Sequence, residues 1–148
     1  MKENELKVFL DGLVHYYNQT TDTEVEVEAP YLIDDINSNL SDYTGRIEIS
    51  GGYKGNVLFT APHRMLVALL ARYGQKGSDV SYLLDLVGEI ANTIAGNARE
   101  SLGSKFNLST PSVTRGNSLE LKTEAGLKTY CVPVKWNKQK AKLIIAVS

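Results

Sequence analysis

Hydrophobic residues recur at helical spacing in three stretches of the chain. The first is residues 2–20, where large hydrophobic side chains follow one another three or four positions apart. This spacing is typical of an amphipathic helix. A second helix is expected from Pro62, which suits the first turn of a helix, to Gly74. A third and longer helix is predicted from Gln75 to Gly103, with Ser78 as its N-cap.

Alternation of hydrophobic and charged residues marks the next segment, residues 24–32. Val25 and Val27 alternate with three glutamates, so the valines face one side of a strand and the carboxylates the other. Pro30 has no N–H to donate and limits how far this strand can pair. The sequence therefore predicts a short strand at this position.

Two stretches of alternating residues on either side of a glycine pair predict a hairpin. The strands are expected at Gly45–Ser50 and Lys54–Ala61. Gly51 and Gly52 join them, and glycine adopts positive φ at little cost in a tight turn.

The second half of the chain shows the same order of patterns. Residues 106–116 predict a strand that contains Pro111, and a hairpin follows with strands Leu127–Trp136 and Lys140–Val147. Each half thus predicts a helix, a strand with a proline and a hairpin, which suggests a duplication. The expected fold class is α+β: a two-layer domain with a largely antiparallel sheet and helices packed on one face.

Composition and charge narrow the classes of protein. The chain has 148 residues, of which 43% are hydrophobic and 22% charged, which suits one domain over residues 1–148. A net charge of -1 argues against nucleic-acid binding. The single cysteine, Cys131, allows no internal disulfide. We see no signal peptide and no apolar run that could span a membrane, so a cytoplasmic protein without a membrane partner is expected.

The third predicted helix has two contrasting faces. At about 100° per residue, its hydrophobic side chains form one arc that suits a core face. This arc comprises Leu83, Val87, Ile90, Ala91, Ile94 and Ala98. Asp85, Glu89, Asn92 and Gly96 lie on the opposite face, where Glu89 and Asn92 are neighbours at a spacing of three residues.

Two glycines in this helix lower its intrinsic stability and require a reason. Gly88 and Gly96 lie on or near the face of Glu89 and Asn92, so another molecule could approach the carboxylate and the amide closely. The alternative is that the glycines allow close packing against another element of the same chain. The spacing alone leaves both interpretations open.

The helix sequence GEIANTIAGNA, with LLDLV before it and a strand containing STPSV after it, resembles the CheX and CheC-like phosphatases of bacterial chemotaxis. The resemblance extends over nearly the whole chain and implies the same two-layer fold. It implies hydrolysis of the phosphoaspartate of a CheY-type receiver, with Asn92 positioning the attacking water and Glu89 contacting a lysine of the receiver. Asp85, Gly88 and Gly96 are then expected to contact the partner.

The resemblance also predicts partners. A phosphorylated CheY-type receiver brings its own Mg²⁺, so no cofactor of this chain is expected, and CheX-like proteins form homodimers. The alternative function is a CheX-like binding or dimerisation module that docks on a signalling partner without catalysis.

The first predicted helix departs from the CheC pattern. CheC proteins carry Glu-x-x-Asn in both halves, whereas the first helix here has His15 and Asn18 at that spacing, so a single CheX-like site is expected. His15 is expected to be half-buried and hydrogen-bonded, and Cys131 to be a small buried hydrophobic residue. With two histidines and one cysteine, we expect no metal site.

Overall fold

A computed structural model of the protein describes residues 1–75, 77–103, 105–116, 121 and 127–148. The helices are α1 (Glu3–Thr20), α2 (His63–Arg72) and α3 (Val80–Leu102), with a short 3-10 helix at Asn37–Asn39. The strands are β1 (Glu26–Val27), β2 (Tyr31–Leu32), β3 (Tyr43–Gly51), β4 (Gly55–Ala61), β5 (Phe106–Leu108), β6 (Ser112–Arg115), β7 (Tyr130–Trp136) and β8 (Gln139–Val147).

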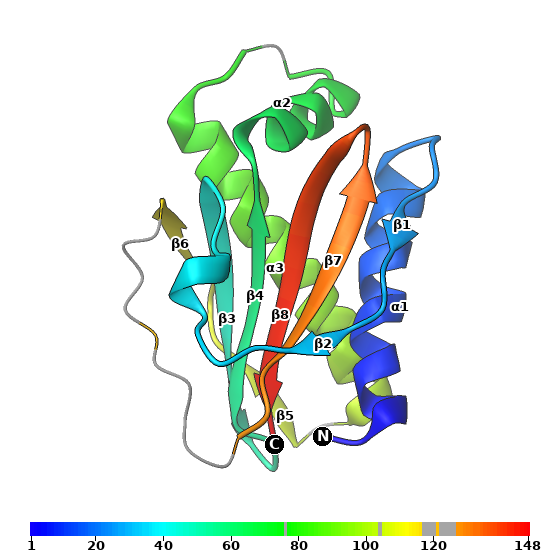
Figure 1. The fold of residues 1–148 in the computed structure, drawn as a ribbon. Coiled ribbons are helices and arrows are strands. Elements are labelled where there is room, and N and C mark those ends of the chain that lie inside the picture. Colours follow the sequence, from blue (N-terminus) through cyan, green and yellow to red (C-terminus); the bar gives the residue numbers. More distant parts are fainter. Residues whose placement is uncertain (76, 104, 117–120, 122–126) are drawn as a thin grey trace.

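The strands form one antiparallel sheet, in which the short strands of each half of the chain lie at the outer edge of the hairpin from the other half (Figure 1). The order is β1-β7-β8-β4-β3-β5, with β2 also paired to β7 and β6 also paired to β3. The short strands of each half therefore pair with the hairpin of the other half. β4 and β8, the second strands of the two hairpins, pair at the centre. This arrangement agrees with the predicted duplication.

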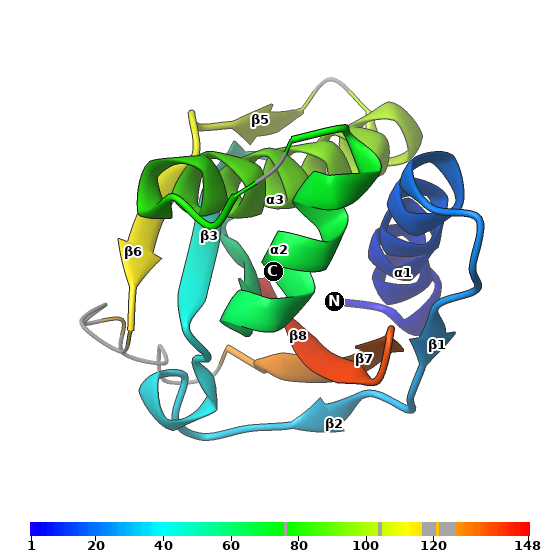
Figure 2. The same ribbon diagram turned by 90° about the horizontal axis from the view of Figure 1, so that it is seen from above.

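Helices α1 and α3 cover one face of the sheet, and α2 lies across one end of it (Figure 2). The main core lies between these helices and the sheet, and its largest fully buried side chains include Trp136, Tyr17, Phe9 and Phe59. A smaller cluster on the other face contains Cys131, which is buried as expected. The predicted α+β fold with helices on one face is confirmed. None of the helices in the described ranges could cross a membrane.

A proline divides each of the two strands predicted at residues 24–32 and 106–116. Pro30 lies between β1 and β2, and Pro111 lies between β5 and β6. A proline cannot donate to the strand ladder, so pairing stops and resumes beyond it. The sequence predicted this limit on pairing for Pro30, but it did not predict a second short strand at either proline.

The predicted N-cap of the third helix is wrong by one residue. Asp79, and not Ser78, is the N-cap of α3. The backbone carbonyl of Asp79 accepts the first helical hydrogen bonds, from the N–H groups of Tyr82 at 3.0 Å and Leu83 at 3.2 Å. The C-terminal end agrees with the prediction, since Gly103 ends the helix with a φ of 99°.

Candidate functional site

The site is built on α3, whose buried face matches the predicted arc. All six residues of that arc are buried, together with Leu86, Gly88 and Ala95. The helix thus presses a continuous apolar stripe onto the sheet. Burial of this face fixes the rotation of the helix and so decides which side chains face outward.

A glycine of the sheet lets α3 come unusually close to it. A Cβ at Gly45 of β3 would meet the carbonyl oxygen of Val87 and would lie 2.8 Å from its carbonyl carbon. Only glycine fits at this separation, since real Cβ atoms do not approach so closely. The backbone of β3 therefore supports α3 directly at the turn before Glu89.

Gly88 does not lie on the open surface, and that prediction is wrong. It is buried, and a Cβ there would lie 2.8 Å from Cγ1 of Val113 and 3.3 Å from Cβ of Pro111. The short strand β6 and the proline before it cover this position. The alternative that was left open for the glycines, close packing within the chain, holds for Gly88.

Glu89 and Asn92 lie on the solvent-facing side of α3, as predicted. Both are exposed, and within the described ranges neither side chain has a hydrogen-bond or ion-pair partner. Three residues apart on a helix, the two side chains are surface neighbours. A carboxylate accepts hydrogen bonds or pairs with a cation, and a carboxamide both donates and accepts. Together they can hold a cation and orient a polar molecule such as water.

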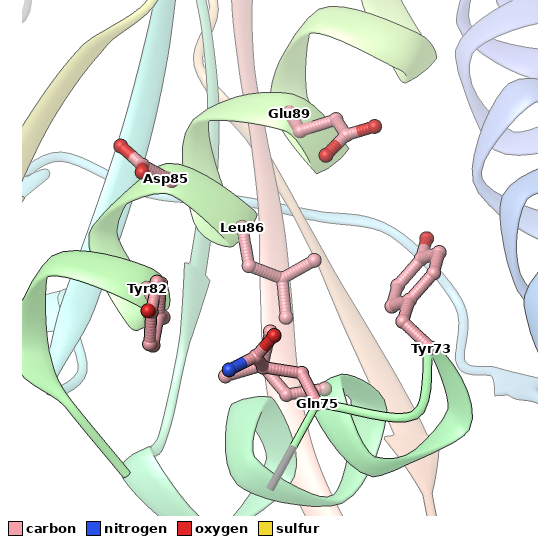
Figure 3. A pocket seen from close by; sticks show the side chains of 7 residues that line it. Tyr73, Gln75, Tyr82, Asp85, Leu86 and Glu89 are labelled. Carbon is pink, nitrogen blue, oxygen red and sulfur yellow. The ribbon is translucent and has the colours of Figure 1, made fainter. Parts of the chain in front are cut away.

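A pocket of about 280 Å³ adjoins Glu89 and extends toward the end of α2. Its lining residues are Leu70, Tyr73, Gln75, Tyr82, Asp85, Leu86 and Glu89. Figure 3 shows the two tyrosines on opposite sides, with Leu86 and Gln75 between them and both carboxylates along the upper edge. The pocket thus has aromatic sides, an aliphatic floor and an acidic edge.

One wall of this pocket is held in place by α1. The hydroxyl of Tyr73 lies 3.1 Å from the hydroxyl of Tyr16 and 3.3 Å from Oγ1 of Thr20. Burial and the hydrogen bond to Tyr73 raise the pKa of Tyr16 far above its ordinary value, so this hydroxyl stays protonated. The ring of Tyr73 is anchored at its polar end, yet its side chain is 52% exposed.

The other predicted contact residues lie on either side of the pair. Asp85 is exposed and lines the pocket one turn before Glu89. Gly96 lies one turn after Asn92, and a Cβ there would have no neighbour within 4 Å. Gly96 also lines a second hollow with Leu108 and with Arg99, whose Nε donates to the carbonyl of Phe106 at 2.9 Å. The surface beside Asn92 is therefore low and open.

His15 of α1 lies apart from this site, and its predicted environment is wrong. The side chain is exposed and, among the described residues, has no hydrogen-bond partner. It lines a shallow groove between α1 and α3 with Asp11, Asn97 and Glu100. The buried face of α1 is formed by other side chains, such as Leu13, which leaves position 15 outside. In the described part of the chain, no three His, Cys, Asp or Glu side chains gather as a metal site would require.

Sequence reasoning did not find the tyrosines of the pocket. Tyr73 follows the end of α2 and Tyr82 lies in the first turn of α3. Tyr73 precedes and Tyr82 follows a polar connection that contains glycines. An aromatic residue next to such a connection can indicate a binding site. What could not be seen is that the connection brings them to opposite sides of one hollow.

A known protein family matches more than half of the chain. The model of the family described as chemotaxis phosphatase CheX matches residues 43–135, a segment that includes all of α3. No curated protein matches the chain in sequence.

Several solved structures share the fold. A CheC-like superfamily protein from Shewanella sp. PV-4 has 24% identity and a TM-score of 0.86, with 100% of this chain and 99% of that chain covered. The chemotaxis protein CheX from Vibrio vulnificus has 20% identity and a TM-score of 0.84, with 98% and 99% covered. A CheX from Borrelia burgdorferi, solved as a complex with CheY, BeF₃ and Mg²⁺, has 17% identity and a TM-score of 0.79, with 97% of each chain covered.

Proposed function

This chain belongs to the family of the chemotaxis phosphatase CheX, and from that premise we propose that it hydrolyses the phosphoaspartate of a CheY-type receiver. The observation that carries the proposal is the exposed pair Glu89 and Asn92, side by side on the rigidly supported helix α3. The Borrelia complex of CheX with CheY supports a receiver as the partner.

The proposed role of Asn92 is to position water. Its side-chain carbonyl accepts a hydrogen from the water, and its NH₂ group donates to a neighbouring polar atom. The water oxygen forms a bond to phosphorus as the bond from phosphorus to the aspartyl oxygen breaks, which yields inorganic phosphate and a free carboxylate. The proton of the water passes to the phosphate or to solvent. Such in-line displacement depends mainly on positioning and on charge neutralisation.

The proposed role of Glu89 is to orient the complex. Its exposed carboxylate is free to pair with a lysine of the receiver, which would set the angle at which α3 approaches the phosphoryl group. Replacement of Glu89 by alanine should weaken binding and slow turnover together. Unchanged binding of a Glu89→Ala protein would remove this role.

Mg²⁺ would belong to the receiver and not to this chain. Magnesium is held by carboxylates and phosphoryl oxygens, and a phosphorylated receiver carries both at its own active site. We therefore assign to this chain the water-positioning amide and the docking contacts, and to the receiver the cation and the phosphorylated aspartate.

The experiment measures the decay of a phosphorylated CheY-type receiver from the same genome in the presence of Mg²⁺. Receiver alone is compared with receiver plus the native protein or the Asn92→Ala variant. Acceleration by the native protein only is expected. If a receiver binds but its decay is not accelerated, the chain is a binding module that docks without catalysis.

We also propose that the protein forms a homodimer, as the resemblance implies. Among the described strands β2 pairs only with β7, so its other edge is free to pair with a second chain, and its residues Tyr31 and Leu32 are 44% and 58% exposed. Light scattering at micromolar concentration should give about twice the mass of the 16.3 kDa chain. A mass of one chain would contradict the dimer.

A further inference from the structure

The pocket beside Glu89 is not required for positioning water, and its lining points to a separate task. Asp85 is one helical turn from Glu89, or about 6 Å along the axis, and Tyr82 is about 10 Å away. A receiver whose active site covers Glu89 and Asn92 would present a different part of its surface to Asp85 and Tyr82. The pocket is thus placed to recognise a feature outside the reacting groups.

We propose that this pocket binds a lysine or arginine side chain on the receiver surface and so selects which receiver the protein serves. The inference rests on the proposed function, because it takes the receiver as the partner that covers α3. It adds Tyr73, Tyr82 and Asp85 as residues that determine specificity.

Size is the first argument for a single side chain as the occupant. The pocket volume of about 280 Å³ is at the lower end of the range of about 300 to 1,000 Å³ that small-molecule sites occupy. The pocket is open to solvent, and the tyrosines on its two sides, Tyr82 and Tyr73, are 45% and 52% exposed. A side chain from a docked protein can enter it without any movement of α2 or α3.

Charge is the second argument. The lining contains two carboxylates, Asp85 and Glu89, and none of the residues described there is basic. Glu89 is already assigned to the lysine of the receiver, which leaves Asp85, and within the described ranges Asp85 has no ion-pair partner. An anionic or acidic occupant would be repelled, whereas a cation would supply the missing partner.

The shape of the lining is the third argument. Leu70 and Leu86 are buried and form an aliphatic floor on which the methylene stem of lysine or arginine can pack. The tyrosine rings flank the pocket, and aromatic faces attract ammonium and guanidinium groups. Because the hydroxyl of Tyr73 is held by Tyr16 and Thr20, this ring is positioned before the partner arrives.

Calorimetric binding of a CheY-type receiver from the same genome, activated with BeF₃⁻ and Mg²⁺, tests the proposal. Tyr82→Leu should weaken binding about five- to tenfold, while Tyr82→Phe, which keeps the ring, should restore it. Asp85→Asn should weaken binding about threefold to tenfold and make it less sensitive to salt. Glu3→Gln is the matched control, because Glu3 is exposed in the first turn of α1, at the opposite end of that helix from the residues that contact Tyr73, and bears the same charge.

Charge reversal identifies the occupant. Asp85→Lys should abolish most binding, and one Lys→Glu or Arg→Glu change on the receiver should recover it. Equal binding by the native, Tyr82→Leu and Asp85→Asn proteins would overturn the proposal, as would tighter binding after Asp85→Asn. Equal weakening by Tyr82→Leu and Tyr82→Phe would overturn the aromatic contact.

The two proposals fail in different ways. If the native protein binds the receiver but does not accelerate its decay, the phosphatase function fails while the pocket is still tested by these binding measurements. If the native protein accelerates decay and the pocket variants bind normally, only the pocket proposal fails. If no receiver binds, both are contradicted.

Discussion

The two long helices that cover the sheet, α1 and α3, correspond in the two halves of the chain but present different surfaces. On α3, Glu89 and Asn92 are exposed beside a pocket with aromatic sides. On α1, His15 and Asn18 have the same spacing and are also exposed, but position 15 carries no carboxylate and lies in a shallow groove against Asn97 and Glu100 of α3.

The glycines of the two helices are used in opposite ways. A Cβ at Gly12 of α1 would lie 3.0 Å from the carbonyl oxygen of Ile94, so this glycine serves the contact between the helices. Gly96 of α3 has no neighbour within 4 Å. The comparison teaches that a repeated framework does not repeat a site, because the chemistry needs the right side chains and an open surface at the same place.

The largest effect is expected at Asn92, the residue that distinguishes the chemistry of α3. Asn92→Asp should reduce the acceleration of receiver dephosphorylation about 100-fold, because a carboxylate loses the donor group and repels the phosphoryl oxygens. Phosphate release measured with saturating receiver checks this, with circular dichroism as the control for folding. Near-native turnover by a folded Asn92→Asp protein would remove the water-positioning role.

A second change tests the support that strand β3 gives to α3. Gly45→Ala should lower the free energy of unfolding by about 1 to 3 kcal/mol, because the new Cβ meets the backbone of Val87. Urea denaturation measures the loss. An unchanged midpoint would show that α3 can move away from β3 without cost.

A smaller effect of opposite sign is expected at the open glycine. Gly96→Ala should raise the free energy of unfolding by about 0.5 to 1 kcal/mol, since alanine favours the helix and meets no neighbour. Gly12→Ala is the matched comparison and should give no such gain, because its Cβ is crowded by Ile94. Equal gains at both positions would mean that the contact between the helices is looser than its geometry indicates.

The smallest effect is expected when the missing carboxylate is placed on α1. His15→Glu creates the Glu-x-x-Asn spacing with Asn18, yet we expect no turnover when it is combined with Asn92→Ala. Position 15 lies in a groove whose other wall is formed by Asn97 and Glu100 of α3, so α1 lacks the open surface on which a receiver could dock over the new pair. Recovery of dephosphorylation in the double variant would show that α1 is a latent second site.

Local patterns in the sequence predicted most of the framework. Helical spacing identified the buried arc of α3 and the outward position of Glu89 and Asn92. The two hairpins followed from alternation and from their turns, where Gly51 has a φ of 96° and Asn137 and Lys138 have φ values of 50° and 62°. These features depend on residues close together in the chain, so a single sequence carries them.

Other features depend on residues far apart in the chain, and only the tertiary structure decided them. Gly88 is buried because β6 crosses over it, and the sequence of α3 alone does not reveal that strand. Tyr73 and Tyr82 line one pocket because α2 and α3 pack against each other. Helical spacing decides which face of α3 can be open, but the elements that pack around the helix decide which part of that face stays open and what lies beside it.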